Sequence, residues 1–189
     1  SRFSACSKIR LALLSIISFA LLSGLLFAEV RLPAIFGDHM VLQQETGAPI
    51  WGWADPGESI AVLGSWGSET MVRADSRGKW MAFLDTPSYG GPHSVEIRGE
   101  NRITLENVLI GEVWLCAGQS NMGWRLSATM HGPEAAQVAD FPGIRIFRSE
   151  RAHSHEAQDD VVAEWKVCNP DSAATCSAVT FYFARKLQR

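Results

Sequence analysis

An apolar run that ends in a glycine and a serine constrains this chain more than any other stretch. Residues 113–117 are apolar, Gly118 interrupts them, and Ser120 follows two residues later. Buried strands of parallel sheets read as continuous apolar runs, and glycine permits the sharp turn that can end one. A serine on such a turn is displayed at the carboxyl edge of the sheet, where open α/β sheets bind their ligands. The stretch therefore predicts a buried strand that presents Ser120 at a candidate site.

The residues before Gly111 carry the signals of short strands separated by turns. Asp55-Pro56-Gly57 is a typical turn, because proline presets φ and glycine accepts a positive φ. Residues 69–74 and 79–84 flank a second turn and are interpreted as a hairpin. Several short strands at this spacing predict a β-sandwich over residues 29–109, a plausible size for one domain.

The residues after Met122 have a different pattern. Residues 132–139 predict a short helix with Pro133 in its first turn, and residues 144–147 predict a strand. From Ser172 onward, apolar residues at three- to four-residue spacing predict a helix. An α/β sheet cannot close on one strand and one crossover helix. We therefore expect an α+β chain in two parts, in which residues 110–189 begin a larger α/β domain.

The first 28 residues have the pattern of an export signal. Arg2, Lys8 and Arg10 precede an uncharged apolar run over residues 11–27, and Ala28 offers a small residue for cleavage. An uncleaved membrane anchor is the alternative. We expect a secreted or periplasmic protein, for which the membrane matters only through this signal.

Export would carry the cysteines into a compartment where disulfides persist. Cys168 and Cys176 are close enough in sequence to pair across a loop, and Cys116, inside the apolar run, is expected to be a small buried side chain. These cysteines lack the spacing of metal ligands, so we expect no metal and no cofactor.

Charge and aromatic content narrow the class of partner. The formal net charge is −3 and no basic stripe is present, which argues against nucleic acid as a partner. The seven tryptophans are interpreted mainly as core residues, with stacking platforms for sugars as the alternative.

Ser120 is the candidate nucleophile. A serine hydroxyl needs a neighbouring base to take its proton, usually a histidine oriented by a carboxylate. A backbone N–H at a helix start is well aimed to stabilise an oxyanion. Taken alone, however, Gly-x-Ser is also the pattern of a helix-capping serine.

The longer string is more specific. Residues 112–122, EVWLCAGQSNM, closely resemble the nucleophile block of the sialate O-acetylesterase family, which belongs to the SGNH/GDSL-type serine esterases. Residues 32–36 and 38–43 resemble the opening of the family's amino-terminal β-domain. Residues 177–185 resemble a helix of its hydrolase domain. The resemblance thus spans the chain and implies a β-sandwich followed by the start of an SGNH-type hydrolase domain.

The resemblance implies hydrolysis of acetyl esters on sugars, so the expected partner is an acetylated sugar or glycan. Ser120 would attack the acetyl carbonyl, form an acyl-enzyme, and supply one oxyanion donor through its N–H. Gln119 and Asn121 flank it and would shape the substrate site. The family's Asp-x-x-His pair lies beyond residue 189. We therefore expect an amino-terminal fragment that is inactive alone.

Other histidines and other functions remain as alternatives. Asp38-His39 is interpreted as structural, and the remaining histidines as solvated: His93, His131, His153 and His155. Gly123-Trp124-Arg125 departs from the family, which has an acidic residue and a proline around this tryptophan. The alternative functions are a non-catalytic carbohydrate-binding or interaction module and an acetylxylan-type esterase.

Overall fold

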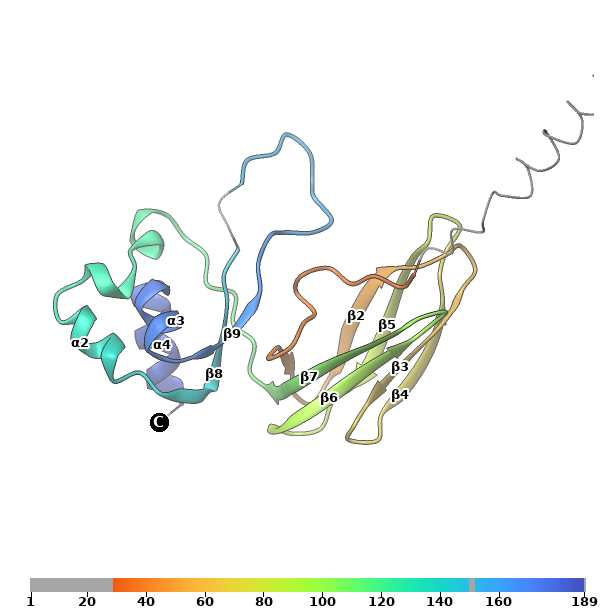
Figure 1. The fold of residues 1–189 in the computed structure, drawn as a ribbon, viewed down its shortest axis with the longest axis horizontal. Helices are drawn as coiled ribbons and strands as arrows, with labels where there is room; N and C mark the ends of the chain where they lie inside the picture. The colour runs from red at the N-terminus through yellow and green to blue at the C-terminus, as the bar shows by residue number, and fades with distance from the viewer. Residues whose placement is uncertain (1–28, 150–151, 189) are drawn as a thin grey trace, which may run out of the picture.

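The computed structural model describes residues 29–149 and 152–188. The expected export signal, residues 1–28, lies outside the described residues. Within the described residues the fold is rich in β-sheet and has few helices, which appear only after Gly111 (Figure 1). No helix in this part of the chain is long and apolar enough to cross a membrane.

The first part consists of two sheets. The larger sheet has the strand order β1-β7-β6-β3-β4, and only its β1–β7 pair is parallel. The smaller sheet is the antiparallel pair β2–β5. The strands are β1 (Val41–Gln43), β2 (Gly47–Trp53), β3 (Ser59–Gly64), β4 (Glu69–Arg73), β5 (Lys79–Asp85), β6 (Gly90–Arg98) and β7 (Arg102–Gly111).

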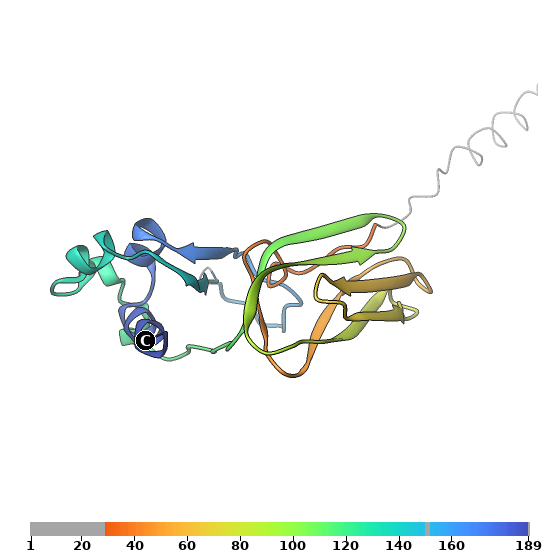
Figure 2. The ribbon, with the colours of Figure 1, turned by 90° about the horizontal axis from the view of Figure 1, so that it is seen from below.

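The two sheets lie one against the other (Figure 2), and their buried side chains form one hydrophobic core. In β5, Trp80, Ala82 and Leu84 are buried while the residues between them are exposed. This alternation places one face of the strand inward. The inward side chains meet Ile60 and Val62 of the larger sheet in a single cluster. Each fully buried aliphatic side chain of this size contributes about 1.5–3 kcal/mol.

The predicted hairpin between residues 69–74 and 79–84 is wrong. β4 pairs with β3, and β5 pairs with β2, so the turn between them joins the two sheets. The turn itself is as expected: Asp75 Oδ1 accepts the N–H groups of Arg77 and Lys79, and Gly78 has a φ of 74°. Turn chemistry fixes where the chain reverses, whereas the partner of each arm depends on strands distant in sequence.

The second part is smaller and packs around its own cluster of buried residues, which includes Leu126, Cys168 and Phe181. β8 and β9 form an antiparallel pair, and short helices lie beside it (Figure 1). The helix at residue 132, the strand at 144–147 and the helix near the end match the sequence predictions. The elements are two 3₁₀ turns, η1 (Ser120–Gly123) and η2 (Leu126–Ala128), then α2 (Gly132–Gln137), β8 (Phe141–Phe147), β9 (Trp165–Cys168), α3 (Pro170–Thr175) and α4 (Ala178–Leu187).

The predicted buried strand at residues 113–117 is also wrong. Residues 112–118 belong to no strand, and Leu115 is 94% exposed and Trp114 58% exposed. An apolar run becomes a buried strand only when strands pair with its edges and other elements cover its faces. No described strand pairs with this segment, so its apolar side chains face solvent.

The three described cysteines also differ from the expectations. Cys116 is exposed, because its segment is not buried, and Cys168 and Cys176 are free rather than disulfide-bonded. Cys168 ends β9 and Cys176 follows α3, and both pack as apolar side chains in the second cluster. Burial raises the pKa of both thiols, that of Cys176 to about 11.

Arg145 on β8 ties the second part to the first. Its Nη1 donates to the backbone oxygens of His39, at 3.3 Å, and Asn107, at 3.2 Å, and its Nη2 donates to Asn107 Oδ1 at 3.1 Å. His39 and Asn107 have φ values of 69° and 55°, and their side chains meet at 2.8 Å. The two left-handed residues therefore direct their carbonyl groups at one guanidinium.

The loop between β8 and β9 makes a second set of contacts with the first part (Figure 1). Trp165 Nε1 donates to the Ile35 oxygen at 2.7 Å. The Ala34 N–H donates to Asp160 at 2.8 Å, and Lys79 Nζ lies 2.9 Å from Asp159. The loop thus spans from residues 34–35 to β5.

Arg145→Ala should lower the free energy of unfolding by about 1.5–3 kcal/mol, because it leaves several half-buried acceptors without their charged donor. Arg145→Lys should recover only part of this, since an ammonium lacks the planar fork. Urea denaturation followed by tryptophan fluorescence measures both. Arg148→Ala is the control, because Arg148 is exposed and donates its hydrogen bond to the Thr175 oxygen within the second part, so its loss should lower stability by at most about 1 kcal/mol. Equal effects at Arg145 and Arg148 would contradict the tethering role.

Iodoacetamide at pH 8 should alkylate Cys116 in the folded protein and spare Cys168 and Cys176. Only the thiolate reacts, and a pKa of about 11 leaves about one part in a thousand of Cys176 ionised at that pH. Labelling of Cys176 should therefore rise as the pH approaches 11 or on addition of urea. Peptide mapping by mass spectrometry without reduction checks this. A Cys168–Cys176 disulfide peptide in that map would refute it.

Candidate functional site

Ser120 is the first residue of the η1 turn, and its side chain is exposed. The turn is closed by hydrogen bonds from the Met122 N–H to the Gln119 oxygen, at 3.0 Å, and from the Trp124 N–H to the Asn121 oxygen, at 3.3 Å. Gln119 and Asn121 are exposed on either side of the serine. The three residues singled out from the sequence therefore lie together on one exposed turn.

Gly118 permits this turn by the space it leaves. A Cβ atom at this position would lie 2.5 Å from Cγ of Met122, a separation that real Cβ atoms do not adopt. The Met122 side chain therefore folds back over the glycine. The close approach of the Met122 side chain to the backbone of Gly118 accounts for a glycine two residues before the serine.

The segment that follows the Ser120 turn is hydrogen-bonded to the chain between α3 and α4. The Leu126 N–H donates to the Cys176 oxygen, and the Ala178 N–H donates to the Trp124 oxygen, both at 2.9 Å. Leu126 is fully buried between them. Ser120 is thus carried by a segment anchored on a packed cluster rather than by a free loop.

An apolar surface lies beside this segment. The Trp114 and Phe183 rings meet edge to face with centroids 5.2 Å apart, and both remain exposed. α4 carries the apolar residues at helical spacing that the sequence predicts near the end of the chain. The buried residues of α4, however, are Ala178 and Phe181. The spaced apolar residues face solvent instead: Val179, Tyr182, Phe183 and Leu187.

No described histidine is hydrogen-bonded to Ser120. Asp38 Oδ1 accepts the Glu106 N–H at 2.7 Å, and the His39 ring meets the Asn107 amide, so the two do not form an acid–base couple. This confirms the structural interpretation of the Asp38-His39 pair.

The remaining histidines are dispersed. His93, interpreted as solvated, is partly exposed and packs against Trp66 with ring centroids 5.3 Å apart. His131 is exposed before α2, and His153 and His155 are exposed in the β8–β9 loop. Among the described residues, no three histidine, cysteine or acidic side chains are grouped so as to hold a metal ion.

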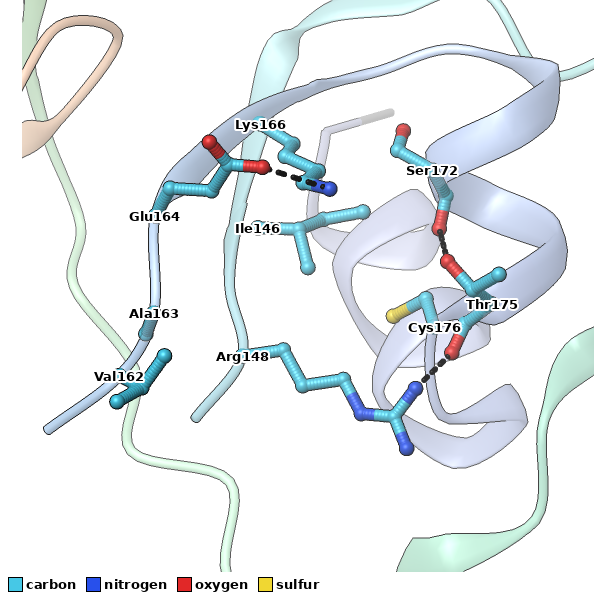
Figure 3. A pocket seen from close by; sticks show the side chains of 9 residues that line it. All are labelled: Ile146, Arg148, Val162, Ala163, Glu164, Lys166, Ser172, Thr175 and Cys176. Atoms are coloured by element: carbon cyan, nitrogen blue, oxygen red, sulfur yellow. Dashed lines mark hydrogen bonds and ion pairs between the residues drawn. The ribbon is translucent and has the colours of Figure 1, made fainter. Parts of the chain in front are cut away.

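Two cavities lie away from Ser120. One, of about 370 Å³, is bordered by β8, β9 and α3, and Figure 3 shows Arg148, Lys166 and Cys176 among its lining residues. The second, of about 280 Å³, lies over the β2–β5 pair and is lined by several tryptophans. Sequence reasoning missed the second cavity, although the tryptophan count was the signal that pointed to it.

Curated relatives of this chain are sialate O-acetylesterases. The mouse protein (Mus musculus) is 36% identical over 143 residues, which cover 69% of this chain and 26% of the relative. The human protein (Homo sapiens) is 29% identical over 177 residues, which cover 83% of this chain and 34% of the relative. The chain thus spans about a quarter to a third of the length of these relatives. No family model matches the sequence.

A solved structure agrees with these relatives. A carbohydrate acetylesterase from Xanthomonas citri superposes with a TM-score of 0.81 at 34% sequence identity, covering 85% of this chain and 37% of that protein. An identity of this size supports a relationship in family as well as in fold. The sequence relatives and the structural neighbour together make this chain a member of a sialate O-acetylesterase-like family.

Proposed function

We propose that this chain is part of a carbohydrate O-acetylesterase in which Ser120 is the nucleophile. The observation that carries the proposal is the exposed position of Ser120 at the start of η1, on a turn anchored to a packed cluster. Its relatives are esterases that act on acetylated sugars by name. An exposed serine on an anchored turn is the geometry that nucleophilic attack requires.

The chemistry that we propose is acyl transfer. The Ser120 hydroxyl oxygen attacks the acetyl carbonyl carbon, the sugar hydroxyl leaves with a proton, and water then hydrolyses the acetyl-serine to acetate. The Ser120 N–H stabilises the negative charge on the carbonyl oxygen during both steps. Gln119 and Asn121 border the acetyl group and the sugar.

The base that activates Ser120 comes, in this proposal, from outside the described residues. Serine esterases need a base and a group that orients it, and no described histidine meets Ser120. The relatives extend well beyond the share that this chain covers. We therefore assign activity to the whole protein and expect none from this piece alone.

The same reasoning gives a proposal for the domains. We propose a β-sandwich over residues 29–109, followed by the beginning of an SGNH-type hydrolase domain over residues 110–189. The exposed apolar residues 113–115 and the outer face of α4 support the second assignment, since such patches mark surfaces that other elements cover. We further propose that residues 1–28 direct the protein to the periplasm or the cell exterior.

Ser120→Ala in the full-length protein should reduce acetate release from acetylated sugars by at least about a thousandfold, because it removes the nucleophile itself. Acetate release from an O-acetylated sialic acid and from an acetylated xylo-oligosaccharide is the measurement. Ser127→Ala is the matched control, because Ser127 is an exposed serine on the neighbouring η2 turn. It should retain activity within about threefold.

A phosphonate that labels active-site serines gives an independent check. Mass spectrometry should find the adduct on the peptide that contains Ser120, and the Ser120→Ala variant should remain unlabelled. Undiminished acetate release by Ser120→Ala would end the proposal. Labelling of another serine with loss of activity would assign the nucleophile elsewhere.

A further inference from the structure

The β2–β5 pair has an aromatic face directed away from the larger sheet. In β2, Ile50 and Gly52 are buried toward the core, so the residues between and after them, Trp51 and Trp53, lie on the opposite face. Across the pair, Trp51 is opposite Met81 and Trp53 is opposite Lys79. Both tryptophans are half-buried, and Met81 is 53% exposed.

A cavity of about 280 Å³ is built on this face. It is lined by Trp51, Trp53 and Met81 from the face, by Asp75 and Lys79 at its edge, and by Asp159 from the β8–β9 loop. Small-molecule sites start at about 300 Å³ and combine apolar walls with a few polar groups. At about 280 Å³ this cavity lies at the lower limit of that range, which suits a single sugar ring, and its lining is of the right kind.

The charges around the cavity balance. Each carboxylate at the cavity has one cationic partner: Lys79 Nζ lies 2.9 Å from Asp159, and Arg77 lies 3.6 Å from Asp75. A charged ligand would displace one of these contacts and leave its partner unpaired. The lining therefore favours a neutral ligand with several hydroxyl groups.

We propose that this cavity is a carbohydrate-binding site for a neutral pyranose unit, separate from Ser120. The apolar C–H face of a pyranose ring packs on an indole, and its hydroxyl groups pair with carboxylates, an ammonium group and an indole N–H. No residue of the Ser120 turn lines the cavity. The site holds a sugar without cleaving it, and it stands whether or not Ser120 is a nucleophile.

Nuclear magnetic resonance of the tryptophan indole N–H groups tests the site directly. The signals of Trp51 and Trp53 are assigned by single Trp→Phe variants, and the protein is titrated with cellotriose, xylotriose and maltotriose. At least one neutral trisaccharide should shift both signals saturably. N-acetylneuraminic acid and choline, which carry opposite charges, should not.

Variants distinguish a specific binding site from non-specific adsorption of the sugar. Trp53→Ala should weaken binding by about tenfold or more. Met81→Arg should do the same by filling the cavity from an exposed position, which leaves the core intact if Trp53→Ala fails to fold. Phe83→Ala is the matched control, since Phe83 is 60% exposed on the same strand but lines no part of the cavity. It should change affinity by less than about twofold.

Ser120→Ala should bind the trisaccharide as the unaltered protein does. The proposal is overturned if no neutral trisaccharide shifts the two indole signals, or if choline or N-acetylneuraminic acid shifts them instead. It is also overturned if Met81→Arg binds with unchanged affinity, or if Ser120→Ala abolishes binding. Loss of esterase activity in Ser120→Ala with binding retained separates this site from the proposed reaction centre.

Discussion

The joint between the two parts of this chain is centred on one guanidinium. Arg145 on β8 donates hydrogen bonds to the carbonyl groups of His39 and Asn107. His39 lies just before β1, and Asn107 lies within β7, both in the larger sheet. Both acceptors have left-handed backbone geometry, which asparagine tolerates better than most residues. Burial lowers the pKa of Arg145, yet an arginine stays charged in proteins, so its hydrogen bonds are charge-assisted. The contact between the two parts therefore depends on the left-handed backbone of His39 and Asn107 as well as on the Arg145 side chain.

The loop from β8 to β9 depends on that same joint. Because Arg145 fixes β8 beside the first part, the following loop lies over residues 34–35 and reaches Lys79 through Asp159. Asp159 then forms one wall of the cavity on the β2–β5 face. The proposed sugar site thus combines strands of the first part with a loop of the second, whereas the Ser120 turn is held entirely by the second part.

The site at Ser120 shows what a motif can and cannot supply. The turn, the glycine before it and the anchoring through Trp124 and Leu126 are complete within the described residues. No described histidine is hydrogen-bonded to Ser120, and the apolar residues 113–115 are exposed on the surface. Nucleophile display is a local property of a turn, whereas activation of the nucleophile needs groups brought together by distant segments.

The sequence by itself determined the features that depend on a few neighbouring residues. The turns at Asp55-Pro56-Gly57 and at Gly78, the helix at Pro133 and the exposed Ser120 all follow from local backbone preferences. Only the tertiary structure decided that β4 and β5 join opposite sheets, that residues 113–117 form no strand, and that Trp51 and Trp53 line one cavity. Pairing, burial and cavities arise from residues far apart in the chain, and no local pattern encodes which distant partner is present.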